Sequence, residues 1–218
     1  MTPTTDDAPE TGLPELPPTS WAVLGLLSFG EELSGYDLKK WADWSLKFFY
    51  WSPSFSQIYG ELKRLEKAGF ATSRVELTES TRAKRVYRIT GEGRDAVARW
   101  ADRSPVEPPV LKHGVMLRAW LGHLMAPDRL RRILEEHGEY ADKMRRRAEV
   151  DAEGAAENPE WAYTELVLRW SERYYAAERD LARQMLADLA EMEAKGRTGP
   201  SESDGAGDAG GTRTDTGG

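Results

Sequence analysis

The first hundred residues contain segments whose apolar and polar positions predict helices. Residues 20–30, SWAVLGLLSFG, are almost entirely apolar and predict a short buried helix that begins at Ser20 and ends before Gly30. A second helix is predicted from Ser34, because Asp37 follows it at the spacing of a capping box. In that motif two side chains satisfy backbone N–H groups at the start of a helix.

A third helix is predicted between residues 54 and 69. Ser54 and Gln57 again have capping-box spacing, and Gly69 marks the end of the helix. The apolar residues of this segment recur at positions i, i+4 and i+7 and predict one buried stripe: Ile58, Leu62 and Leu65. Four aromatic residues, 48–51, precede the helix, and we interpret them as packing that fixes its direction.

Two runs typical of β-strands follow. FATSRVEL (70–77) and KRVYRIT (84–90) are β-prone, and the polar residues TESTRA between them predict a hairpin. The next segment, GEGRDAVARWADR (91–103), predicts a helix with Thr90 at its N-cap. Three helices, two strands and a helix, in this order, are typical of a winged helix-turn-helix domain.

The rest of the chain predicts helices only. The helical runs cover 111–125, 127–150 and 161–194, and the breaker DAEGAAENP (151–159) separates the last two. The last run has an apolar stripe of near-heptad spacing, which suits contact with another helix. This stripe includes Leu166, Trp170, Tyr174, Leu181 and Met185.

The predicted fold class is therefore mainly α, with an N-terminal winged helix-turn-helix and an all-helical C-terminal dimerisation domain. The proline-rich residues 104–110 predict a linker between them. The predicted boundaries are a disordered N-terminus at 1–18, the winged domain at 19–103, the helical domain at 109–195 and a disordered tail at 196–218.

Composition and charge narrow the classes of function. The 218-residue chain has no cysteine and no apolar run long enough to span a membrane, and its N-terminus is acidic and rich in proline. We therefore expect a cytoplasmic protein that does not associate with membranes. The net charge is −7, yet residues 54–90 hold eight basic and four acidic residues, so positive charge gathers around the third helix and the hairpin.

Residue patterns for catalysis are missing from the sequence. The three histidines, His113, His123 and His137, have no metal-ligand spacing and no cysteine beside them. The sequence contains neither a phosphate-binding glycine loop nor a serine nucleophile elbow. We therefore expect no enzymatic activity, no cofactor and no metal.

The third helix and the hairpin together predict a surface for double-stranded DNA. A DNA-reading helix needs small polar residues near its N-terminus and basic residues further along, and a basic wing can contact the backbone or the minor groove. A solvated helix face and a solubilising hairpin tip are the alternatives. The candidate DNA contacts are Ser54, Ser56, Gln57, Tyr59, Gly60, Lys63 and Arg64 on the helix, and Arg82, Lys84 and Arg85 on the wing.

The runs WAVLGLLSFGEELSGYDLKK, WSPSFSQIYGELKRLEKAGF and KRVYRITGEGR resemble the PadR family of bacterial transcriptional regulators. The later runs HGVMLRAWLGHLMAPDRLRRILEEH and ELVLRWSERYYAAERDLARQML resemble the virulence-activator-type helical domain of its larger members, so the resemblance covers roughly residues 20–190. It implies a homodimer, usually a repressor, that binds an inverted-repeat operator through the helix and wing residues above. The hairpin tip TESTRAKR is shorter than the family pattern, and the acidic ends lie outside that pattern.

Some members of this family are released from DNA by aromatic or cationic hydrophobic small molecules. Trp100, Trp120 and Trp161 are candidate effector-binding residues, because a pocket of tryptophans could stack a planar ligand. The alternative is that these tryptophans belong to the core or to the dimer interface. Leu166, Trp170, Tyr174, Leu181 and Met185 are the candidate interface residues.

Two other functions fit parts of the pattern. The winged domain could be a protein–protein interaction module that docks an acidic protein and does not bind DNA. The chain could also be a helical small-molecule-binding protein with a vestigial winged domain. Salt dependence separates the first of these from a DNA-binding protein, because phosphate neutralisation makes DNA affinity fall steeply with salt.

Overall fold

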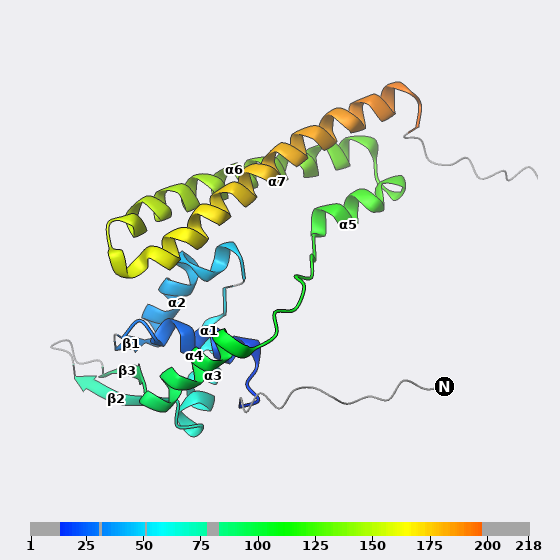
Figure 1. Ribbon diagram of the computed structural model, residues 1–218. Coiled ribbons are helices and arrows are strands. Elements are labelled where there is room, and N and C mark those ends of the chain that lie inside the picture. Colours follow the sequence, from blue (N-terminus) through cyan, green and yellow to red (C-terminus); the bar gives the residue numbers. More distant parts are fainter. Residues whose placement is uncertain (1–13, 31, 51, 78–82, 198–218) are drawn as a thin grey trace, which may run out of the picture. The chain divides into compact units, whose positions relative to one another are not determined.

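Figure 1 shows the computed structural model of the chain, which describes residues 14–30, 32–50, 52–77 and 83–197. The chain forms two compact units, the first comprising residues up to 110 together with 146–173 and the second comprising 111–145 together with the residues from 174 onward. Most of the predicted disordered ends, 1–18 and 196–218, lie outside the described residues. The predicted domain boundaries stay predictions.

The first unit contains the winged helix-turn-helix. Its helices are α1 (Pro18–Leu27), α2 (Gly35–Trp44), α3 (Phe55–Lys67) and α4 (Gly91–Arg103), and a 3₁₀ turn, η1 (Leu46–Phe48), follows α2. Its strands are β1 (Leu33–Ser34), β2 (Ala71–Leu77) and β3 (Ala83–Ile89). This order confirms the predicted fold class.

Side-chain caps fix where the helices of the winged domain begin. The Ser34 hydroxyl accepts a hydrogen bond from the backbone N–H of Asp37, and the Asp37 carboxylate accepts one from the backbone N–H of Ser34 at 2.9 Å. Ser54 and Gln57 form the same reciprocal pair at the start of α3. Caps of this kind stabilise a helix by about 1 kcal/mol each, so the sequence signals for α2 and α3 are confirmed.

The wing is a three-stranded antiparallel sheet of order β1-β3-β2. The hairpin pairs Ala71 with Ile89 and Leu77 with Ala83. The two-residue strand β1 adds to the other edge of β3, with Leu33 opposite Tyr87. The sequence predicts the hairpin but not β1. A strand of two residues is too short to show an alternation of apolar and polar positions, and it forms only by pairing with β3, which lies far along the chain.

The core of the winged domain is built from the apolar faces of α1–α4 and the inner face of the sheet. The α3 stripe is fully buried, as predicted. Trp21 and Trp100 stack with ring centroids 5.3 Å apart, which joins α1 to α4. The other buried contributors include Val23, Leu24, Leu27, Leu38, Ala42, Ile58, Leu62, Leu65, Ala71, Tyr87 and Ile89.

Two local expectations in this domain need correction. Helix α1 begins at Pro18, with no side-chain cap, and Ser20 lies buried inside it and donates a hydrogen bond to the Glu61 carboxylate on α3. The aromatic run before α3 packs only in part, because Phe48 is buried whereas Phe49 and Tyr50 are largely exposed. Its fourth member, Trp51, lies outside the described residues.

The C-terminal half of the chain is dominated by two long helices, α6 (Pro127–Ala156) and α7 (Ala162–Ala194). Figure 1 shows them side by side, and their contacts run antiparallel: Arg131 pairs with Glu193, whereas Asp142 pairs with Arg179 at 3.3 Å. Small residues on α6 allow close approach, since a Cβ at Gly138 would be 3.6 Å from the Cβ of Ala182. Short elements complete this part: α5 (Gly114–Trp120), η2 (Gly122–Leu124) and η3 (Pro159–Trp161).

The predicted break at 151–159 is wrong for most of its length, because α6 continues to Ala156. Ala152 and Ala155 are fully buried, and Arg147 forms an i,i+4 ion pair with Asp151. These interactions outweigh Gly154, which destabilises a helix interior by about 1 kcal/mol. The predicted helix 111–125 is also shorter than expected, and its ordered turns are α5 and η2. Within the described part of the chain, no helix combines the length and apolar character needed to cross a membrane.

Candidate nucleic-acid interface

Helix α3 presents two faces of opposite character. Its buried stripe faces the core, whereas the predicted contact residues on the helix are all exposed: Ser56, Gln57, Tyr59, Gly60, Lys63 and Arg64. Ser54, the N-cap, is exposed as well. The structure therefore brings the predicted helical residues together on one accessible surface, which we call the α3 face.

The first turn of α3 is held by hydrogen bonds among these same residues. The Gln57 side-chain oxygen accepts a hydrogen bond from the Ser54 backbone N–H at 2.8 Å, and the Ser54 and Ser56 hydroxyls are 3.0 Å apart. The Gln57 oxygen is thus engaged in the cap, which leaves its amide N–H groups as the donors available to a ligand. Capping also aligns the free N–H groups of the helix start, where the helix dipole favours an anion.

The basic residues of the α3 face differ in their surroundings. The Arg64 guanidinium is 3.1 Å from the carboxylate of Glu61, an i,i+3 ion pair on the same helix. Lys63 forms no ion pair with any residue that the structure describes. Lys63 therefore carries a positive charge that is open to an external anion, whereas the charge of Arg64 is partly neutralised.

An aromatic surface adjoins the start of α3. Tyr36 and Phe55 stack with ring centroids 6.4 Å apart and planes 15° apart, although both side chains are exposed. The Tyr59 ring lies against the backbone of Gly35. Tyr36 and Phe55 were not among the predicted contact residues. The sequence signal for them is the Gly35-Tyr36 pair at the start of α2, where a residue without a side chain precedes a large aromatic one.

Of the wing residues that the sequence selected, Lys84 and Arg85 are described, and both are exposed. Lys84 and Arg85 lie on the exposed part of β3 close to the tip. The Lys84 ammonium is 3.0 Å from the Asp37 carboxylate, so the wing is connected to the start of α2. Arg82 lies outside the described residues.

The Asp37 carboxylate serves both the α2 cap and the wing. Its burial alone would raise the pKa, but hydrogen bonds from Ser34 and the ion pair with Lys84 outweigh burial and hold the pKa of Asp37 below its ordinary value. Asp37 is therefore ionised at neutral pH and remains a partner for Lys84. On β2, Arg74 donates three hydrogen bonds to the Glu32 carboxylate, at 2.5, 3.0 and 3.2 Å.

The predicted interface residues on α7 are exposed or half-buried. Leu166, Trp170 and Leu181 are each more than half exposed, and Tyr174 and Met185 are half-buried. Exposed apolar side chains repeated along one helix are typical of a surface that another protein covers.

The predicted effector residues have different surroundings, each described within its own unit. Trp100 stacks on Trp21 in the core, and Trp161 contacts Trp44 with ring centroids 5.3 Å apart. Trp120, in the second unit, is exposed. The packing alternative is therefore the better description of Trp100 and Trp161.

A three-stranded wing beside a capped helix with an exposed polar and basic face defines a winged helix-turn-helix protein of the DNA-binding class. Residues 23–99 match the Transcriptional regulator PadR-like family, and a long helical C-terminal extension follows this region. The family is one of regulators and not of enzymes, in agreement with the sequence analysis.

A protein from Bacillus subtilis (strain 168), the negative transcriptional regulator PadR, is 39% identical over 100 residues, which are 46% of this chain and 54% of that protein. The matching region thus spans about half the length of that relative. The crystal structure of Bacillus subtilis PadR in complex with operator DNA matches with a TM-score of 0.64 and 27% identity, over 78% of this chain and 98% of that one. The structure of the same protein with p-coumaric acid matches with a TM-score of 0.60 and 25% identity, over 81% and 99%.

Proposed function

We propose that the protein is a homodimeric transcriptional repressor that binds an inverted-repeat DNA operator through α3 and the wing. The observation that carries the proposal is the α3 face: a helix fixed by a capping box, with its polar and basic residues exposed beside a basic wing. A relative with the same fold has been crystallised with operator DNA. This role requires access to the chromosome and therefore a cytoplasmic location.

In this proposal α3 is the recognition helix and enters the major groove. Ser56, Tyr59 and Gly60 lie nearest its N-terminal half, where recognition helices contact base edges. Lys63 and Arg64 lie one turn further along and would contact phosphates. The amide N–H groups of Gln57 remain available to a base or a phosphate while its oxygen holds the cap.

The wing would contact the DNA beside the major groove. Lys84 and Arg85 lie near the start of β3, and Arg82, which the sequence also selects, lies outside the described residues. Cations in this position interact with the sugar-phosphate backbone or with the minor groove. The exposed Tyr36–Phe55 stack adds a flat apolar surface at the start of α3.

A homodimer supplies the symmetry that an inverted repeat requires. The two recognition helices must stand about 34–36 Å apart, one turn of B-DNA. The exposed apolar residues of α7, from Leu166 to Met185, are the surface we assign to the dimer. Their near-heptad spacing fits a helix from the partner chain.

A small-molecule effector would relieve repression. The PadR structure with p-coumaric acid is the support for a planar aromatic ligand. Of the three tryptophans selected from the sequence, Trp120 is the exposed one and remains the candidate for a ligand contact. Such a ligand could act only by binding one conformation of the dimer better than the other.

Fluorescence anisotropy with a labelled DNA fragment from the promoter of the protein's own gene tests the proposal. We expect saturable binding that prefers this fragment to a scrambled duplex. A protein that neutralises about 6–10 phosphates loses on the order of 10³–10⁵ in affinity between 50 and 200 mM salt. If binding at low salt shows no preference for the fragment, and a shallow salt dependence, the protein–protein module is the better description.

A further inference from the structure

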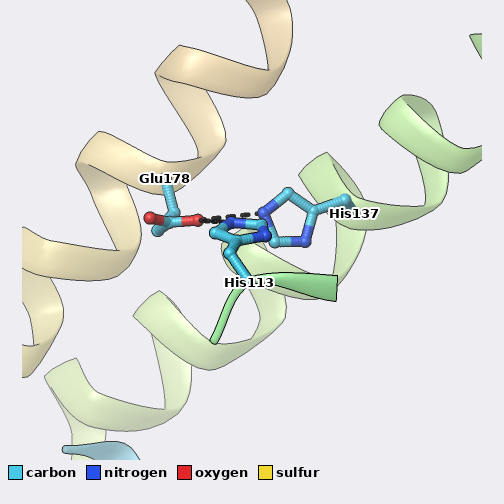
Figure 2. A group of neighbouring side chains, drawn as sticks. All are labelled: His113, His137 and Glu178. Carbon is cyan, nitrogen blue, oxygen red and sulfur yellow. Dashed lines mark hydrogen bonds and ion pairs between the residues drawn. The ribbon is translucent and has the colours of Figure 1, made fainter. Parts of the chain in front are cut away.

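In the second unit, two of the three histidines lie beside the carboxylate of one glutamate. Figure 2 shows His113, just before α5, and His137, on α6, with their rings directed towards Glu178 on α7. The Nε2 atom of each histidine is 3.0 Å from the same oxygen, Oε2 of Glu178. The three side chains are between 13% and 15% exposed, so the cluster is sheltered but has access to solvent.

We propose that His113, His137 and Glu178 form a binding site for a divalent transition-metal ion of the Zn²⁺ class. One donor atom from each residue lies within 4.8 Å of the other two, and among the described residues this is the grouping of three such side chains that could hold a metal ion. Two ligands bonded to one tetrahedral Zn²⁺ at about 2.0–2.1 Å lie about 3.3 Å apart. The observed nitrogen–oxygen distances therefore need only a small outward shift to admit the ion.

The types of the donor atoms favour this class of metal. Imidazole nitrogen suits Zn²⁺, Ni²⁺, Cu²⁺ and Fe²⁺, whereas Mg²⁺ and Ca²⁺ prefer sites made of oxygen ligands. Two histidines and one carboxylate fill three positions of a tetrahedral ion and leave the fourth for water or a small ligand. Such an ion would connect three segments of the helical unit: the chain before α5, α6 and α7.

A neighbouring tyrosine orients the Glu178 carboxylate in the way that a metal ligand requires. The Tyr174 hydroxyl lies one turn before Glu178 on α7 and donates a hydrogen bond to its carboxylate. Hydrogen bonds of this kind orient a metal-binding carboxylate and are a regular part of metal sites. The His137 ring also stacks on Tyr140, with centroids 6.5 Å apart, which limits its rotation.

Metal binding would change the start of α5. The Nδ1 atom of His113 accepts a long hydrogen bond, 3.4 Å, from the backbone N–H of Met116, so the unbound ring carries its proton on Nε2. Coordination through Nε2 moves the proton to Nδ1, and the contact with Met116 is then lost. The ion therefore replaces a weak helix cap with a bond to His113, and the first turn of α5 becomes more mobile.

The test uses the full chain without an affinity tag, stripped with a chelator and titrated with ZnCl₂ in a calorimeter. We expect saturable binding of one ion per chain and a rise in Tm on addition of Zn²⁺, since a ligand of the folded state stabilises it. Glu178→Gln and His137→Gln should each weaken binding by at least about tenfold, because loss of a ligand exceeds the effect of loss of its supporting hydrogen bonds. His123→Gln is the matched control, because this exposed histidine lies outside the cluster and should leave the affinity unchanged.

Glu178→Gln keeps a hydrogen-bond acceptor on the side chain, so this variant separates metal binding from packing. Hydrogen exchange gives a second measurement: Zn²⁺ should reduce protection of the Met116 N–H in the wild-type chain. Unchanged protection there would remove His113 from the ligand set and overturn the three-residue site. Absence of saturable binding, or wild-type affinity in both Glu178→Gln and His137→Gln, would show that the cluster is a hydrogen-bonded contact between helices only.

Discussion

The ring of Tyr59 lies directly on the backbone of Gly35. A Cβ atom placed on Gly35 would be 2.5 Å from Cζ of Tyr59 and 2.8 Å from its hydroxyl oxygen. No side chain can occupy position 35 while Tyr59 keeps this orientation. The glycine at the start of α2 therefore determines where an exposed tyrosine on α3 stands.

Gly35→Ala should weaken operator binding more than it destabilises the fold. Tyr59 is half exposed, and its ring can rotate away from a methyl group, so the free energy of unfolding should change by less than about 1 kcal/mol. A displaced Tyr59 should reduce DNA affinity by about 1–3 kcal/mol. Anisotropy and urea denaturation measure the two quantities.

A double-mutant cycle identifies the cause of the loss. In a Tyr59→Ala background, Gly35→Ala should have no further effect on affinity, because the two changes act through one ring. Gly25→Ala on α1 is the control, since nothing lies within 4 Å of its added Cβ. Additive losses in the cycle would mean that position 35 affects binding by another route.

Gly93→Ala should destabilise the winged domain strongly. Its Cβ would lie 2.1 Å from the carbonyl oxygen of Phe70, which is backbone and accepts a hydrogen bond from the N–H of Thr90. We expect a loss of about 1–3 kcal/mol or more in the free energy of unfolding. Gly91→Ala, two residues away in the same helix with no atom within 4 Å, should be nearly neutral in the same urea titration.

Asp37→Asn should destabilise the protein at neutral pH and not in acid. The pKa of Asp37 is lowered in the folded state, so its stabilising effect is complete above the pKa of the unfolded chain, near 4, and is lost as the pH falls through the lower folded value. At pH 7 we expect a loss of about 1 kcal/mol, since hydrogen bonds to a charged acceptor exceed those to a neutral one by about that amount. Thermal unfolding of both proteins from pH 7 to pH 3 should show the difference shrink towards zero; a constant difference would exclude the charge as its origin.

Lys63→Ala and Ser56→Ala should affect DNA binding in different ways. Loss of the Lys63 cation should weaken binding to all duplexes alike and reduce the salt slope by about 1. Ser56→Ala should instead narrow the difference between the operator and mismatched duplexes. Arg132→Ala, an exposed cation on α6, serves as the control for net charge. Equal behaviour of the Lys63 and Ser56 variants would contradict our division between phosphate and base contacts.

If the protein is the homodimer that we propose, Leu166→Glu and Trp170→Glu should convert it into monomers. Each change places a charge on the exposed apolar stripe of α7, where a partner helix would bury it without a counter-charge. Sedimentation should show the monomer, and affinity for an inverted repeat should fall while half-site binding persists. Glu191→Gln, near the end of α7 and exposed, should leave the mass unchanged. An intact dimer in both variants would locate the interface elsewhere.

Most helices of the winged domain could be predicted from the sequence, because their signals involve residues that are close together along the chain. The caps at Ser34, Ser54 and Thr90 depend on residues three positions apart, and the α3 stripe depends on spacings within one helix. The predicted break after residue 150 failed because the burial of Ala152 and Ala155 depends on tertiary packing, which no local pattern of small residues shows.

Long-range relationships account for the rest. Strand β1 exists only because β3 lies beside it. In the histidine–glutamate cluster, Glu178 is 65 positions from His113 and 41 positions from His137, so no local sequence motif predicts the cluster. Gln57 was predicted both as a capping residue and as a DNA contact, and its side-chain oxygen is engaged in the cap. Which residues touch DNA stays a prediction.

The ion pair between Lys84 and Asp37 has a consequence for how many salt ions DNA binding releases. A phosphate that takes Lys84 from Asp37 leaves this carboxylate without its ion-pair partner, although Ser34 still donates hydrogen bonds to it, and the carboxylate then attracts a cation from solution. One counterion is released from the DNA phosphate, but one cation is taken up at Asp37. Lys84 therefore contributes little to the net number of ions that DNA binding releases. The number of basic residues on this surface is therefore larger than the number of phosphate contacts inferred from the salt dependence of binding. The difference between the two numbers equals the number of basic residues whose charge is already paired within the free protein.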